Sequence, residues 1–141
     1  MITIENATDL AVDSTALERI AQRLTQREVE LTLCDDTTIR ELNRDYRGID
    51  RPTDVLSFPL AGELPHQPLG ALVISVDRVR AKAAELGHGE MEELSLLFIH
   101  GLLHLLGYDH ERDDGEMRQK ETELIRELGL PESLIVRTEG A

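Results

Sequence analysis

The chain has 141 residues, 40% of them hydrophobic, so it can bury one core and we expect a single domain over residues 1–141. A net charge of −13, 3% aromatic residues and no Trp exclude a general binder of single-stranded nucleic acid, because such proteins need basic grooves and stacking rings. The single cysteine excludes an internal disulfide, and no stretch approaches the roughly 20 apolar residues of a membrane span. The first residues also lack the pattern of a secretory signal, so we expect a cytoplasmic protein with no membrane partner.

The first half of the sequence alternates strand and helix patterns. Residues 1–5 suit an edge strand, and residues 29–33 alternate apolar and polar side chains as a half-buried strand does. Two pairs of threonine and glutamate at capping-box spacing predict helices that begin at about Thr15 and Thr38. Gly48 predicts the end of the second helix at about residue 47.

The second half contains two apolar strands and then only helices. Residues 55–58 predict a strand that Pro59 stops, and the proline-rich stretch after it predicts a loop. Residues 71–76 are almost continuously apolar, as in a central strand covered on both faces. Three further helices are expected over residues 77–87, 90–106 and 114–128.

Four short strands and about five helices predict an α+β domain, a small mixed four-stranded sheet with the helices packed over one side. The helix between residues 33 and 55 suggests a parallel pair of strands across it. The short link between residues 58 and 72 favours an antiparallel pair. We therefore expect a mixed sheet, with a strand order that the sequence leaves open.

Three histidines gather in the string HGLLHLLGYDH. His100 and His104 are four residues apart in a strongly predicted helix, so both rings project from one face. Gly107 then ends the helix, and the turn after it can fold His110 back toward the same point. Three imidazoles that leave one coordination position open are typical of catalytic zinc, so we expect one Zn²⁺ on His100, His104 and His110.

The alternative for a histidine in an apolar helix is ordinary packing with a satisfied hydrogen bond. Three of five histidines within eleven residues are harder to explain by packing, because each buried ring must recover its lost hydration. His66 and His88 lie in Pro/Gly-containing loops and are expected to be exposed and outside the site.

Gly101 stands where zinc proteases of the HExxH type have their glutamate base, so ordinary peptidase chemistry is disfavoured. A glycine inside a helix costs about 1 kcal/mol relative to alanine. Either a strand or the substrate approaches closely there, or the position is only a tight packing contact. Asp109 is expected to orient one of the histidines.

The string HGLLHLLGYDH, with YRGIDRPTDVLSFP upstream and LGALVIS between them, resembles the bacterial YbeY family of endoribonucleases. The likeness covers about residues 43–114, in the same order. It implies a zinc-dependent, single-strand-specific endoribonuclease that acts in rRNA maturation, including 16S rRNA 3′ end processing, and in ribosome quality control. Its implied partners are rRNA precursors and components of the small ribosomal subunit. The resemblance also implies that Arg47 and His100 are catalytic.

One position departs from the family. Where the family often has an acidic residue after the glycine of its LGD-type strand, this chain has Ala71. A ribosomal-protein contact made by that acid is therefore not implied for this chain.

The arginines around the YRG motif give separate support for a phosphodiester substrate. Arg40, Arg44 and Arg47 recur at helical spacing and Arg51 follows, which permits a small basic patch on an acidic protein. Arg47 is expected to bind a phosphate, whereas the other three are expected to pair with neighbouring acids.

Two other functions remain open. The first is a metal-dependent hydrolase of another substrate, such as a peptide or a small phosphoester. The second is a non-enzymatic ribosome-assembly factor whose zinc is structural. An open coordination position on the zinc ion would indicate an enzyme, whereas a fourth protein ligand would indicate structural zinc.

Overall fold

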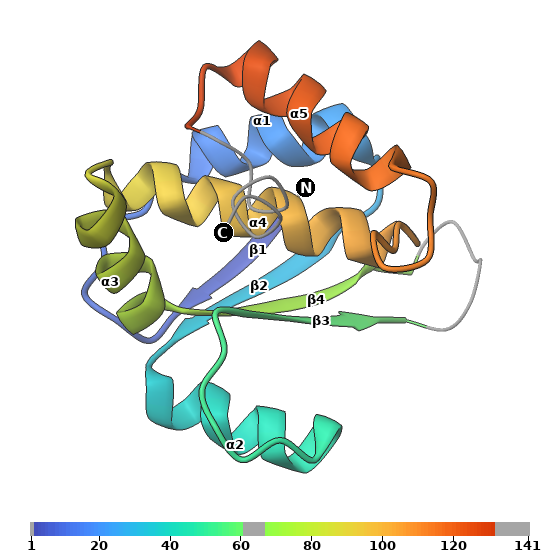
Figure 1. The fold of residues 1–141 in the computed structure, drawn as a ribbon. Helices are drawn as coiled ribbons and strands as arrows, with labels where there is room; N and C mark the ends of the chain where they lie inside the picture. The colour runs from blue at the N-terminus through green and yellow to red at the C-terminus, as the bar shows by residue number, and fades with distance from the viewer. Residues whose placement is uncertain (1, 61–66, 132–141) are drawn as a thin grey trace.

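The computed structural model of the chain describes residues 2–60 and 67–131, and Figure 1 shows their arrangement. In chain order the elements are β1 (Ile2–Asn6), α1 (Ser14–Leu24), β2 (Val29–Cys34), α2 (Asp36–Arg47), β3 (Val55–Pro59), β4 (Gly70–Ser75), α3 (Val76–Leu86), α4 (Glu90–Leu105) and α5 (Glu116–Leu128). The α+β class, the four-stranded mixed sheet and the five helices in one domain are as the sequence predicts.

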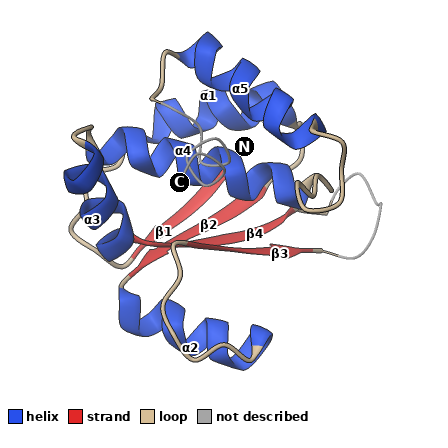
Figure 2. Ribbon diagram, viewed as in Figure 1, coloured by secondary structure: helices blue, strands red, loops and turns tan. Residues whose placement is uncertain are grey.

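The four strands lie in the order β1-β2-β4-β3 (red in Figure 2). β1 pairs with β2 and β2 with β4 in parallel, whereas β3 pairs with β4 in the antiparallel direction. The predicted antiparallel pair, the edge position of the first strand and the central position of β4 are therefore confirmed. At least one parallel pair was expected and two are present, but neither lies across α2. β4 lies between β2 and β3, and β3 runs antiparallel to β4 and therefore also to β2.

The helices cover both faces of the sheet, not the one face expected from the sequence. α4 lies directly over one face, with α1 and α5 stacked on it, and α2 lies under the other face (Figure 1). The central strand β4 explains this, because nearly all of its side chains, on both faces, are buried. Under the sheet a second, smaller core joins α2 to the strands, and its buried members are Cys34, Ile39, Leu56 and Val73.

α4 is the central helix of the larger core. Eleven of its sixteen residues are buried, so it must be covered by other elements on nearly every side. Contacts with β3, β4, α1, α3 and α5 provide that cover. Among residues 2–60 and 67–131, no helix is both long enough and apolar enough to span a membrane.

Three helices begin earlier than the sequence suggested. Asp13 caps α1 by accepting a hydrogen bond from the backbone N–H of Ala16, and Asp35 caps α2 in the same way through Thr38. Ser75 caps α3. The predicted starts at Thr15 and Thr38 are wrong because aspartate upstream of each threonine is the stronger cap.

Candidate metal centre

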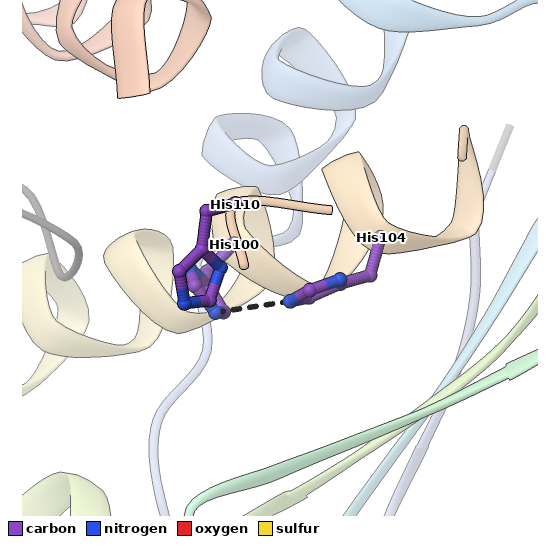
Figure 3. Close-up of side chains that lie close together, drawn as sticks. All are labelled: His100, His104 and His110. Atoms are coloured by element: carbon purple, nitrogen blue, oxygen red, sulfur yellow. Dashed lines mark hydrogen bonds between the residues drawn. The ribbon is translucent and has the colours of Figure 1, made fainter. Parts of the chain in front are cut away.

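Three histidines converge at the C-terminal end of α4. His100 and His104 are one helical turn apart on α4. The helix ends at Leu105, and Gly107, two residues later, has a φ of +98°, a left-handed conformation that glycine adopts without strain. The backbone N–H of Tyr108 then donates to the carbonyl of Leu103 at 3.0 Å, which turns the chain back toward the helix. This turn brings His110 close to the other two rings, with its centroid 5.6 Å from that of His100 and 5.8 Å from that of His104 (Figure 3).

The separation of the three rings fits one metal ion. One nitrogen from each ring lies within 4.8 Å of the other two. The Nε2 atoms of His100 and His104 are 3.3 Å apart (Figure 3). Two nitrogens held tetrahedrally at about 2.0–2.1 Å from one zinc ion would be separated by roughly 3.3 Å. The predicted ligand set is therefore brought together in a geometry that can hold a metal ion.

The protonation of His104 also suits coordination. Burial lowers the pKa of His104 below its usual value, and the charges of His100 and His110 lower it further, while a backbone hydrogen bond with Tyr108 opposes the shift. A lowered pKa favours the neutral ring, which is the form that binds a metal. Nδ1 of His110 is buried and has no hydrogen-bond partner among the described residues, so that nitrogen is available for coordination.

Glu121 from α5 supports this cluster, and the sequence reasoning missed it. Its Oε2 lies 3.2 Å from Nδ1 of His100, and its side chain is 1% exposed. A hydrogen bond from Nδ1–H to the carboxylate leaves the lone pair of His100 on Nε2, which faces His104. The sequence contained one indication of this role, a glutamate on the apolar face of an amphipathic helix. The other buried residues of that face are Met117, Leu124 and Ile125.

Asp109, expected to orient a histidine, instead accepts a hydrogen bond from the backbone N–H of Glu111 and lies 3.6 Å from Arg112. His88 is not exposed as expected, because its Nε2 lies 2.8 Å from Oε1 of the buried Glu93. That pair lies at the start of α4, at the opposite end from the three clustered histidines. The expectation for His66 falls outside the described residues.

Gly101 lets α4 approach the sheet. A Cβ atom at this position would lie 2.8 Å from Cδ2 of Leu72 and 3.1 Å from Cγ2 of Val55. The hydroxyl of Ser57 donates to the carbonyl of Gly101 at 3.2 Å. The neighbours of Gly101 are therefore side chains of β3 and β4, so the position is a tight packing contact between α4 and the sheet.

The histidines open into a cleft of about 810 Å³ along the edge strand β3. The cleft has two walls, because α4 and α2 lie on opposite faces of the sheet (Figure 1). His100, His104 and His110 form the histidine wall, and Tyr46 and Arg47 at the end of α2 form the α2 wall. Arg47, predicted from the YRG motif, is thus in the same cleft as the predicted ligands.

Arg47 differs from its neighbours in its contacts. Arg40 pairs with Asp50 at 2.8 Å and Arg44 with Asp45 at 3.2 Å, so pairing with acids is confirmed for both. No hydrogen bond or ion pair joins the side chain of Arg47 to another described residue. Among the described residues that line the cleft it is the one Lys or Arg.

Cys34 provides no nucleophile for the cleft. It ends β2, is 3% exposed and lies in the small core under the sheet. Burial and the neighbouring acids Asp35 and Asp36 raise the pKa of its thiol to about 11. The thiol therefore remains protonated near neutral pH.

A model of the family described as Endoribonuclease YbeY matches residues 2–129. The chain belongs to the endoribonuclease YbeY family. Endoribonuclease YbeY of Sulfurovum sp. is 60% identical over 99% of this chain and 98% of its own length. Endoribonuclease YbeY of Helicobacter pylori is 54% identical over 99% of both chains.

The fold is also similar to a solved structure. The solution structure of TM1509 from Thermotoga maritima matches with a TM-score of 0.62 and 33% sequence identity. The match covers 91% of this chain and 89% of that one. The YbeY family suggested by the histidine and YRG motifs is therefore confirmed. The match covers nearly the whole sequence, including the residues before 43, which lie outside the motifs.

Proposed function

We propose that residues 1–141 form a single metal-dependent hydrolase domain that cleaves RNA internally, with one Zn²⁺ held by His100, His104 and His110. Arg47 and His100 are the catalytic residues of this proposal. The substrate is single-stranded RNA, and the process is rRNA maturation in the cytoplasm, including 16S rRNA 3′ end processing and ribosome quality control.

The observation that carries the proposal is the convergence of three imidazoles in an open cleft that also contains an arginine without a described partner. The family name supports RNA cleavage as the reaction. Resemblance of the sequence motifs supports the choice of rRNA and of small-subunit components as partners.

In this proposal the histidine wall binds the metal ion and the α2 wall binds the phosphate. When bound, a zinc ion supplies Lewis-acid chemistry, by lowering the pKa of a water molecule or by polarising a phosphoryl oxygen. Glu121 holds the ring of His100 in one tautomer and orientation. Arg47 binds the phosphate through its planar guanidinium and stabilises the negative charge that develops in the transition state.

The first test is RNA cleavage with matched variants. Purified protein is incubated with a structured rRNA precursor, with and without a chelator, and the fragments are separated by size. We expect cleavage that the chelator stops, and its loss in His100→Ala and in Arg47→Ala. His88→Ala and Arg40→Ala are the controls, because these residues lie outside the cleft and are paired with acids. Full activity in both His100→Ala and Arg47→Ala would refute the proposal.

The second test separates an enzyme from an assembly factor with structural zinc. Metal analysis of the purified protein should give one zinc ion per chain. After cobalt substitution, the visible spectrum should report three nitrogen ligands and one exchangeable position that responds to added anions. A spectrum typical of four protein ligands would favour the structural role.

A further inference from the structure

The few aromatic residues of this chain are concentrated at the cleft. The sequence has two Tyr, two Phe and no Trp. Tyr46, Phe58 and Tyr108 line the cleft, and Phe98 is buried in the larger core. A chain with 3% aromatic residues thus places most of them around the three histidines and Arg47.

Tyr46 is the exposed member of this group. It is 69% exposed, the largest exposed fraction of any large hydrophobic residue in the described part of the chain. Phe58 and Tyr108 are only partly exposed, because they pack against the two cores. The ring of Tyr46 is therefore open to a ligand.

The position of the Tyr46 ring is supported by β3. Its centroid lies 5.2 Å from that of Phe58, with 70° between the ring planes, which is an edge-to-face contact. Phe58 is fixed in turn by the pairing of β3 with β4 and by the small core. An aromatic ring held in this way provides a pre-oriented surface, so little rotamer freedom is lost when a flat ligand stacks on it.

We propose that Tyr46 is a stacking site for one unpaired nucleobase of the RNA strand whose phosphate Arg47 binds. This inference rests on the proposed function, because it takes RNA as the occupant of the cleft. Tyr46 and Arg47 are adjacent in the last turn of α2, so one segment offers a π surface for a base and a cation for a phosphate. Stacking needs a base that is free of its neighbours, so the site selects unpaired nucleotides. Every base has a π face, so the site tolerates any sequence.

The test measures binding to the zinc-loaded protein separately from cleavage. The probe is a ten-residue single-stranded DNA, which has bases and phosphates but no 2′-hydroxyl groups, and a gel checks that it stays intact. A second probe has the same backbone with every base removed. Tyr46→Ala should weaken binding of the first probe about tenfold, as expected for one stacked base. It should leave binding of the abasic probe unchanged.

Two control variants accompany Tyr46→Ala. Tyr46→Phe keeps the ring and should bind the first probe as the unmodified protein does. Leu86→Ala removes another exposed apolar side chain, 42% exposed and on α3 away from the cleft, and should have no effect.

Fluorescence gives a direct readout of the contact. Because the chain has no Trp and two Tyr, Tyr108→Phe leaves Tyr46 as the one source of tyrosine emission. In that variant the base-containing probe should quench tyrosine emission and the abasic probe should not.

Equal binding of the first probe by Tyr46→Ala and the unmodified protein would overturn the inference, as would equal losses for both probes. Either result would leave the proposed function standing if the unmodified protein cleaves RNA. Conversely, base-dependent binding through Tyr46 without zinc-dependent cleavage would support the stacking site and refute the proposed reaction.

Discussion

At the scale of single residues, loss of the buried carboxylate of Glu121 should weaken zinc binding at the proposed site. Replacing it by glutamine keeps the shape but removes the negative charge that faces Nδ1 of His100. Zinc affinity should fall by about 10–100-fold, as is typical when a carboxylate behind a ligating histidine is changed. Competition with a chromophoric chelator measures this affinity without any RNA.

Glu93→Gln is the matched control for Glu121→Gln. Glu93 is equally buried and also contacts a histidine, His88, but that pair lies outside the cleft. Its replacement should leave zinc affinity unchanged. Equal losses in the two variants would show that Glu121 acts only through stability.

Cys34 allows a prediction of pH dependence. Its pKa is raised from 9.0 to about 11 in the folded protein, so between these values the folded chain binds a proton that the unfolded chain loses. The contribution of the protonated Cys34 thiol to the free energy of unfolding is therefore complete below pH 9, and it is lost as the pH rises toward about 11. Urea unfolding at pH 8 and pH 10 should show a larger fall in the free energy of unfolding for the unmodified chain than for Cys34→Ala. An equal fall in the unmodified chain and in Cys34→Ala would show that Cys34 is not the source of this pH dependence.

The cluster of three histidines was predictable from the sequence because their spacing is local. His100 and His104 are separated by one helical turn, and His110 follows a glycine that ends the helix, so no knowledge of tertiary structure is needed. Glu121 was not predictable in this way, since its contact with His100 depends on how α5 packs on α4. Asp109 was preferred because it is close in sequence, but its carboxylate turns toward its own loop.

At the scale of elements, Gly101 sets the distance between α4 and the sheet. Gly101→Ala would place a methyl group 2.8 Å from Leu72 and 3.1 Å from Val55, inside a packed core. Overpacking costs about 1–3 kcal/mol, against the roughly 1 kcal/mol gained in helix propensity. Urea denaturation should therefore show a loss of stability of about 1 kcal/mol. A variant that is more stable than the unmodified protein would mean that the sheet yields to the added methyl group.

Element types and approximate bounds were predictable, whereas pairing was only partly so. The short link between β3 and β4 favours antiparallel neighbours, and this was confirmed. A helix such as α2 can connect two strands that pair with each other, or two strands that have a third strand between them. The second arrangement is observed, because β4 lies between β2 and β3. The position of α2 under the sheet follows from the burial of the central strands on both faces, a signal that was present in residues 71–76.

At the scale of the whole molecule, a chain with a net charge of −13 offers few cations to an RNA strand, so RNA binding should depend only weakly on salt. Each phosphate contact on a single strand contributes about −0.7 to the slope of log K against log salt. With Arg47 as the one Lys or Arg among the described cleft residues, the slope should be about −0.7. Titrations of the single-stranded DNA probe at several salt concentrations measure it.

Two arginine variants check this salt dependence. Arg47→Ala should make the slope shallower by about 0.7, whereas Arg40→Ala, whose arginine is already paired with Asp50, should not change it. A slope of −4 or steeper in the unmodified protein would show that a larger basic surface takes part.

The two walls of the cleft rest on different cores, one on each face of the sheet. The histidine wall rests on the larger core around α4, and the α2 wall rests on the small core under the strands. Substitutions around the small core can therefore change the α2 wall while the larger core keeps the three histidines in place. The shape of one wall can thus vary without disturbing the other.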